Sequence, residues 1–223
     1  MKIGNLITIL KRKIISSSFF WKVRHFFQPS WIDSYNNKVT SKFYFDFISE
    51  NNISSILDFG CATGGLLYDL NKENPDLVSY GIDINIKALD ACNKKFKLVT
   101  NSDSAFFFDQ EVNPDNLNLF LKKNNLNKFD LIVFDRVLYC LNESAILSLL
   151  DSFADLTDKI LIDDFEISRE FETQGYNHRD WISLLEKFNF KNTINLPTIY
   201  TKVNKANART LIFQKYDGKR TAL

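Results

Sequence analysis

The sequence predicts an α/β fold: a doubly wound, mostly parallel sheet of seven strands that ends in an antiparallel hairpin and follows an N-terminal helical cap. From Ile53 onward, short apolar runs alternate with helical stretches, which is the pattern of βαβ units around a parallel sheet. Near the end of the chain, two β-rich segments over residues 193–203 and 209–214 flank a turn-like segment, which predicts a hairpin. We therefore expect a cap or lid over residues 1–52 and the sheet domain over residues 53–223.

The cap is predicted to contain two helices. Residues 4–27 place apolar side chains mostly at three- and four-residue steps, as in an amphipathic helix. Gln28-Pro29 ends this helix, because the residue before a proline disfavours helical geometry. A second helix is predicted from about Lys38 to Glu50.

Five strands and five helices are predicted before the hairpin. The strands lie at residues 55–58, 78–84, 96–100, 129–135 and 159–163. The helices lie at residues 64–71, 86–95, 114–123, 143–154 and 179–188. Asn85, Asn113 and Asn177 precede three of these helices and are suited to cap them, because an Asn side chain can accept hydrogen bonds from a first turn.

Composition and charge narrow the function classes. The 223 residues carry a formal net charge of +1, which does not indicate a nucleic-acid partner. Three separated cysteines and two histidines argue against a disulfide framework and against a zinc site. No apolar run reaches the ~18 residues of a membrane span, and we find no signal-peptide core, so we expect a cytoplasmic protein. Its richness in Phe, Ile, Asn and Lys is associated with AT-rich bacterial genomes.

The charge is unevenly distributed, since residues 1–32 contain basic side chains and no acidic one. One interpretation is an amphipathic helix that docks on the sheet domain or on a second copy in a homodimer. The alternatives are attraction to a nucleotide diphosphate, peripheral contact with an acidic membrane surface, or RNA, of which RNA has the least support.

A loop of small residues follows the first predicted strand, in the pattern Asp58-x-Gly60-x-Ala62-x-Gly64. Glycines let a ligand approach the main chain closely, at the sheet edge where open α/β folds bind ligands. The second strand ends at Asp83, whose carboxylate can accept hydrogen bonds from both hydroxyls of a ribose. Gly60-x-Ala62-x-x-Gly65 also fits a relaxed dinucleotide fingerprint, but Asp58 suits a cationic ligand that bears an ammonium better than a pyrophosphate.

Together with Asp103-Ser104 after the third predicted strand, the fourth strand and the hairpin, these motifs resemble the class I S-adenosylmethionine-dependent methyltransferases, which have a Rossmann-like sheet. The resemblance covers about residues 53–215. It implies S-adenosylmethionine as cofactor, and it assigns these binding residues: Asp58, Gly60, Ala62 and Gly64 for the methionine moiety, Asp83 for the ribose, and Asp103 and Ser104 for the adenine. Ile84, next to Asp83, is a further cofactor-binding candidate. Tyr35, in the segment between the cap helices, is expected either to close over the methionine portion or simply to pack.

Reacting groups are expected after the fourth and fifth strands. The spacing places Asp135 beside Asp163 and Asp164, and acids this close need a counter-charge, which Mg²⁺ would supply. The arrangement is similar to that of Mg²⁺-dependent sugar O-methyltransferases, although Val137 stands where those enzymes carry an acid. The alternative is that Asp163 and Asp164 cap a helix or pair with Arg136 or Arg169.

The candidate catalytic residues are Asp135 and His178. An imidazole of ordinary pKa ~6.5 can take a hydroxyl proton near neutrality, although His178 also suits a surface position beside a helix cap. We expect methylation of a hydroxyl on a small polar acceptor, such as a sugar or sugar nucleotide of surface-polysaccharide biosynthesis. The alternatives are a NAD-type oxidoreductase and a non-catalytic, membrane-apposed binding protein.

Overall fold

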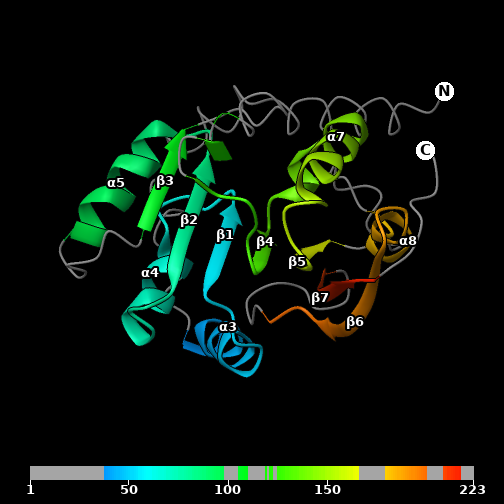
Figure 1. The fold of residues 1–223 in the computed structure, drawn as a ribbon, viewed down its shortest axis with the longest axis horizontal. Helices are drawn as coiled ribbons and strands as arrows, with labels where there is room; N and C mark the ends of the chain where they lie inside the picture. Colours follow the sequence, from blue (N-terminus) through cyan, green and yellow to red (C-terminus); the bar gives the residue numbers. More distant parts are fainter. Residues whose placement is uncertain are drawn as a thin grey trace, which may run out of the picture.

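The computed structural model describes residues 38–97, 105–109, 119, 121–122, 125–165, 179–199 and 208–216. Within these residues, seven strands form one sheet in the order β3-β2-β1-β4-β5-β7-β6 (Figure 1). The strands are β1 (Ser55–Phe59), β2 (Val78–Asp83), β3 (Ala105–Asp109), β4 (Leu131–Asp135), β5 (Lys159–Phe165), β6 (Phe190–Pro197) and β7 (Ala208–Lys215). Strands β1 to β5 are parallel, whereas β7 runs antiparallel to both β5 and β6. The predicted fold class, including the terminal hairpin, is confirmed.

The helices alternate with the parallel strands as the sequence predicts. They are α3 (Lys38–Glu50), α4 (Gly65–Glu73), α5 (Ile86–Lys97), α7 (Glu143–Phe153) and α8 (Trp181–Glu186), with a short 3-10 turn η2 (Leu138–Cys140) after β4. Asn85 caps α5, because its side chain accepts hydrogen bonds from the backbone amides of Lys87 and Ala88. Helix α8 begins later than predicted, and Asp180 rather than Asn177 is its N-cap.

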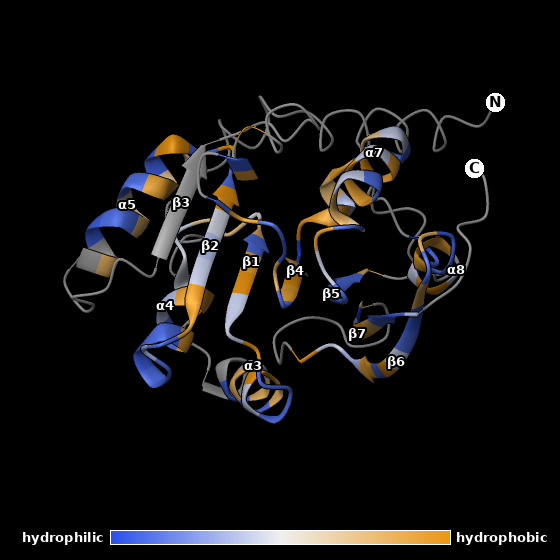
Figure 2. Ribbon diagram, in the orientation of Figure 1, coloured by the Kyte–Doolittle hydropathy of each residue, from blue (hydrophilic) through white to orange (hydrophobic). Residues whose placement is uncertain are grey.

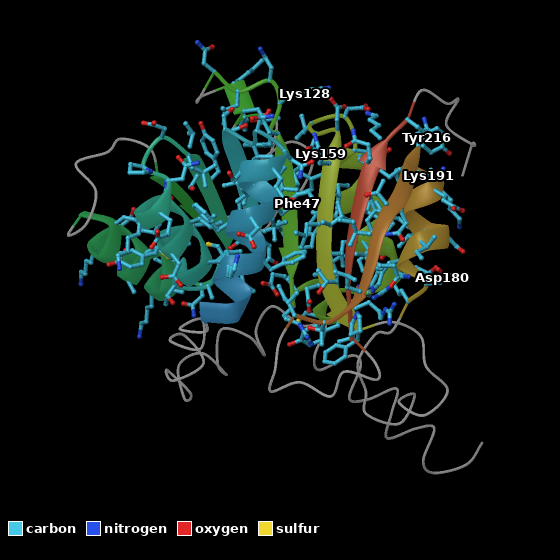
Figure 3. All side chains as sticks on the ribbon, turned by 90° about the horizontal axis from the view of Figure 1, so that it is seen from below. Phe47, Lys128, Lys159, Asp180, Lys191 and Tyr216 are labelled. Atoms are coloured by element: carbon cyan, nitrogen blue, oxygen red, sulfur yellow. The ribbon has the colours of Figure 1, made fainter. Side chains whose placement is uncertain are left out.

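Two apolar cores lie on opposite faces of the sheet, because successive strand residues point to opposite sides. Ile132 and Phe134 of β4 belong to the core that α7 and α8 cover. Leu131 and Val133 belong to the core under α3 and α4. Figure 2 shows hydrophobic and hydrophilic residues on the same helices, as expected for helices that bury one side, and in Figure 3 α3 lies against the sheet.

The predicted third strand is wrong. Residues 96 and 97 belong to α5, and β3 begins only at Ala105. Phe96 is buried, and its ring meets the ring of Tyr68 edge to face at 5.9 Å. The helix continues because Leu89, Cys92 and Phe96 recur at helical spacing and all reach the interior.

The structure does not describe most of the predicted cap or the predicted helix over residues 114–123. Helix α3, the last part of the cap, packs in the same core as β1 and β4 through Tyr44, Phe47 and Ile48. No helix in the described part of the chain has the length and apolar character needed to cross a bilayer.

Candidate functional site

Carboxylates gather where the parallel strands end. β1, β2, β4 and β5 are parallel neighbours, so their carboxyl ends meet at one edge of the sheet (Figure 1). Each of these strands contributes at least one buried acid, and none is more than 7% exposed: Asp58, Asp83, Asp135, Asp163 and Asp164. Charged groups are rarely buried without partners, so the partners of each acid indicate its role.

The loop after β1 has an unusual backbone. Gly60 has a φ of 83°, Ala62 of 48° and Gly64 of 65°. The amides of Gly60 and Cys61 both donate to the carbonyl of Ile82, at 2.7 and 3.1 Å, which fixes the loop to β2. A Cβ atom on Gly60 would lie 2.6 Å from Cγ2 of Val137, so the position has neither the space nor the backbone conformation for a side chain.

Asp83 connects this loop to helix α5. One carboxylate oxygen accepts a hydrogen bond from the amide of Ala62 at 2.9 Å, and the other accepts one from the amide of Asn85 at 2.8 Å. The Cys92 thiol donates to the Ala62 carbonyl at 3.2 Å. A pyrophosphate would need loop amides that are free to donate and would be repelled by Asp58. The geometry therefore disfavours the dinucleotide interpretation.

Asp58 lies in β1, two residues before Gly60, and is buried. Burial raises the pKa of its carboxyl well above the usual range, and the charges of Asp135 and Asp83 raise it further. Burial also raises the pKa of the Cys61 thiol, with contributions from its contact with Cys92 and from the charge of Asp58. The negative charges of Asp135 and Asp83, which contribute to the rise in the pKa of Asp58, would favour a cationic group bound beside them.

Asp135 ends β4 between Asp58 and Asp163. It lies opposite Asp163 in the parallel register, as the spacing predicted. Its Oδ2 atom accepts a hydrogen bond from the hydroxyl of Tyr44 on helix α3, at 3.1 Å. Helix α3 therefore contributes a polar group to an edge that otherwise consists of strand ends and the loop.

Asp163 is held by internal donors. Nε of Arg136 donates to Oδ1 at 2.7 Å, and the Thr198 hydroxyl lies 2.9 Å from both carboxylate oxygens. The Thr210 hydroxyl donates to Oδ2. Burial raises the pKa of Asp163, while the charge of Arg136 and the two hydroxyls oppose that rise.

Asp164 accepts hydrogen bonds from the backbone amides of Tyr139, at 3.1 Å, and Phe165, at 2.7 Å. It thereby fixes the η2 turn after β4. In the part of the chain that the structure describes, no group of three or more His, Cys, Asp or Glu side chains is arranged to hold a metal ion. The donor set does not fit the predicted Mg²⁺ site at Asp135, Asp163 and Asp164, because Arg136 already supplies the counter-charge and Asp164 is used by the backbone. The alternative pairing of Asp163 with Arg136 is confirmed.

The buried acids predict how stability depends on pH. Burial, as the main cause, raises the pKa of Asp164 from 3.8 to about 7, and the pKa of Asp58 is raised as well. The folded protein then binds more protons than the unfolded chain, so the free energy of unfolding should fall as pH rises from about 4 to about 7. Urea unfolding of the ligand-free protein at pH 5.5 and 8 measures this. Asp164→Asn, which cannot ionise, should make the free energy of unfolding less dependent on pH. A free energy of unfolding that rises with pH between about 4 and 7 would contradict the prediction.

Four of the predicted site residues lie outside the described residues: Tyr35, Asp103, Ser104 and His178. Asp103 and Ser104 come before β3 rather than after it, so the prediction that they follow the third strand is wrong. Asp109 ends β3 instead, opposite Asp83 in the register. The signal that could have identified Asp109 is the run Ala105–Asp109, three aromatic residues followed by an acid. Ile84 directly follows Asp83 and is half-buried.

Comparison with known proteins adds an independent observation. Residues 50–210 match the family model of a methyltransferase domain. No curated protein matches the chain. Among solved structures, the plantazolicin methyltransferase BpumL, solved in complex with a triazolic desmethylPZN analog and SAH, has a TM-score of 0.61 and 16% identity, over 93% of this chain and 96% of that chain.

Two other similar structures carry O-methyltransferase names. The mitomycin 7-O-methyltransferase MmcR has a TM-score of 0.57 and 14% identity, over 74% of this chain and 50% of that chain. An O-methyltransferase family protein from Burkholderia thailandensis has a TM-score of 0.58 and 12% identity, over 91% of this chain and 60% of that chain. The chain thus spans about half the length of MmcR. At identities this low, the structural similarity shows a shared fold and nothing more specific.

Proposed function

This chain belongs to the class I S-adenosylmethionine-dependent methyltransferase family, and from that premise we propose that it methylates a hydroxyl oxygen of a small polar acceptor. The observation that carries the proposal is the left-handed loop at residues 60–64 beside the buried carboxylates of Asp58, Asp83 and Asp135. The loop leaves no room for a side chain at Gly60, and the carboxylates favour a cation.

We assign the cofactor-binding residues by their place at this edge. Asp58, Gly60, Ala62 and Gly64 would hold the methionine moiety, and Asp83 with Ile84 the ribose. Asp103 was expected to bind the adenine because it was placed after the third strand. Because β3 ends at Asp109, we propose Asp109 for this contact instead. The contacts of Tyr35 and Ser104 with the cofactor remain predictions. When bound, S-adenosylmethionine supplies a methyl group that its sulfonium already activates.

The protein must then orient the acceptor and take up its proton. Alignment of two reactants in one site supplies a large part of the rate enhancement, which is the task of the loop and the surrounding strand ends. We propose His178 as the general base that accepts the hydroxyl proton, since an imidazole of ordinary pKa ~6.5 is mostly neutral near physiological pH and can take up a proton. Asp135 is the second candidate, since it lies at the end of β4.

We propose a sugar or sugar nucleotide of surface-polysaccharide biosynthesis as the acceptor. Support comes from the order Asp135, Asp163, Asp164, which resembles that of sugar O-methyltransferases, and from O-methyltransferase names among the similar structures. Because Asp163 and Asp164 are engaged by Arg136, hydroxyls and backbone amides, the proposed reaction needs no divalent metal.

A combined binding and turnover experiment tests this function. S-adenosylmethionine and S-adenosylhomocysteine should raise the melting temperature, whereas NAD and NADH should leave it unchanged. Methyl transfer to one of a panel of nucleotide sugars should be detected and should persist in EDTA. His178→Ala should retain cofactor affinity and lose most of kcat.

The opposite outcomes identify the alternatives. Stabilisation by NAD alone would favour an oxidoreductase. Binding of anionic vesicles without any methyl transfer would favour a membrane-apposed binding protein. Activity that is lost in EDTA and restored by Mg²⁺ would contradict the metal-independent proposal.

A further inference from the structure

We propose that Tyr44 is a positioning residue for Asp135: its hydroxyl keeps the negative charge on Asp135 rather than on Asp58, and thereby sets the affinity for a cationic cofactor. This inference rests on the proposed function, because it assumes that the edge described above binds S-adenosylmethionine. It gives helix α3 a part in cofactor binding that its sequence does not indicate.

The contact joins parts of the chain that are far apart in sequence. The Tyr44 hydroxyl donates to Oδ2 of Asp135 at 3.1 Å, across 91 residues. Tyr44 is fully buried and Asp135 is 4% exposed, so water does not compete freely for this hydrogen bond. The ring is fixed by the core that α3 and α4 share with β1 and β4, and it meets Phe43 edge to face at 5.9 Å.

The hydrogen bond from Tyr44 matters because three carboxylates lie near one another at this edge of the sheet. Asp58 of β1, Asp83 of β2 and Asp135 of β4 are close enough that the charges of Asp135 and Asp83 raise the pKa of Asp58. Like charges disfavour each other, so the two neighbouring charges favour a proton on Asp58.

A donor decides where that proton goes, because a hydrogen bond to an ionised carboxylate favours the ionised form. Tyr44 donates to Asp135 from α3. Asp83 accepts hydrogen bonds from two backbone amides, so its charged form is favoured as well. The Cys61 thiol lies near Asp58, and Asp163, opposite Asp135 in the register, is paired with Arg136. The donor therefore favours a charged Asp135, and the burial of Asp58 favours a protonated Asp58.

Tyr44→Phe, measured by calorimetric titration with S-adenosylmethionine from pH 6 to 8.5, tests this assignment. The variant should bind about ten- to hundredfold more weakly at pH 6.5, the fold-change that corresponds to one hydrogen bond to a charged group. The loss should be smaller at the high end of this pH range, where the ionised form of a carboxyl group is favoured without a hydrogen-bond donor. The mid-point of the pH dependence should therefore move upward relative to that of the wild type.

Two controls separate positioning from general destabilisation. Tyr80→Phe removes the hydroxyl of another buried tyrosine, one that packs against Phe129 at 5.3 Å on the opposite face of the sheet. It should leave affinity and its pH dependence unchanged. In an Asp135→Asn background, Tyr44→Phe should cost no further affinity. An unchanged pH profile in Tyr44→Phe, or an equal loss with and without Asp135, would overturn the inference.

A measurement on the ligand-free wild type covers the case in which Tyr44→Phe does not fold. Carboxyl carbon NMR should show that Asp135 titrates at lower pH than Asp58, and the reverse order would overturn the inference. A wild type that fails to bind S-adenosylmethionine would refute the proposed function, whereas normal binding together with a silent Tyr44→Phe refutes only the role of Tyr44.

Discussion

Gly60→Ala is expected to abolish cofactor binding and to destabilise the fold. The new methyl group would lie 2.6 Å from Cγ2 and 2.9 Å from Cβ of Val137, and the second of these atoms cannot move by a rotamer change. The φ of 83° adds a cost of about 1–2 kcal/mol for a residue with a Cβ. With about 1–3 kcal/mol for overpacking, we expect a loss of roughly 2–5 kcal/mol in the free energy of unfolding. Urea unfolding and calorimetric titration with S-adenosylmethionine measure the two effects.

Two further variants distinguish the effect of the steric clash from the effect of the positive φ angle. Val137→Ala in the Gly60→Ala background removes the contact with Cγ2 but keeps the contact with Cβ and the backbone strain, so it should recover only part of the lost stability. Ala62→Gly, at a φ of 48°, should keep or slightly increase stability, because glycine adopts this conformation more readily. Wild-type affinity in Gly60→Ala would contradict the view that a ligand lies against this loop.

The features that could be predicted from sequence are local. The loop, Asp83 at the end of β2 and the Asn85 cap each depend on residues within a few positions of one another, and the structure places them as predicted. The alternation of strands and helices is also a local pattern, which is why the fold class followed from it.

The third strand shows where local pattern fails. Residues 96–100 are apolar enough for a strand, but Phe96 also continues the helical spacing of α5, and periodicity over so short a run cannot separate the two. Tertiary packing decides it, since Phe96 meets Tyr68 of α4. The error placed the expected adenine contact at Asp103, which precedes β3, whereas the acid that ends this strand is Asp109.

The roles of the acids depend on long-range register. Thr198 and Thr210, which hold Asp163, lie 35 and 47 residues away in sequence and reach it because the hairpin returns beside β5. Nothing in the local pattern around Asp163-Asp164 distinguishes a metal ligand from a carboxylate with internal partners. The contact between Tyr44 and Asp135 could not be predicted from the sequence either. The two residues are 91 positions apart, and helix α3 comes before all the strands in the chain, so no local pattern links it to the end of β4.

Asp163→Asn is expected to be strongly destabilising and to leave metal dependence unchanged. Asp163 is fully buried, and the side chain of its partner Arg136 is only 16% exposed. Removal of one partner leaves a mostly buried guanidinium without its counter-charge, which costs about 3–5 kcal/mol in buried ion pairs. The amide group of Asn also places donors against the hydroxyls of Thr198 and Thr210. Urea unfolding measures the loss.

The double-mutant cycle with Arg136→Gln tests the assigned cause. Because the two partners compensate each other, the double variant should be less destabilised than the sum of the single variants, with a coupling of about 1–3 kcal/mol. EDTA should not change the stability of the wild type or of any variant, since no metal takes part in these contacts. If Asp163→Asn unfolded like the wild type but lost activity that excess Mg²⁺ restored, Asp163 would be a metal ligand after all, and the ion pair with Arg136 would not explain its burial.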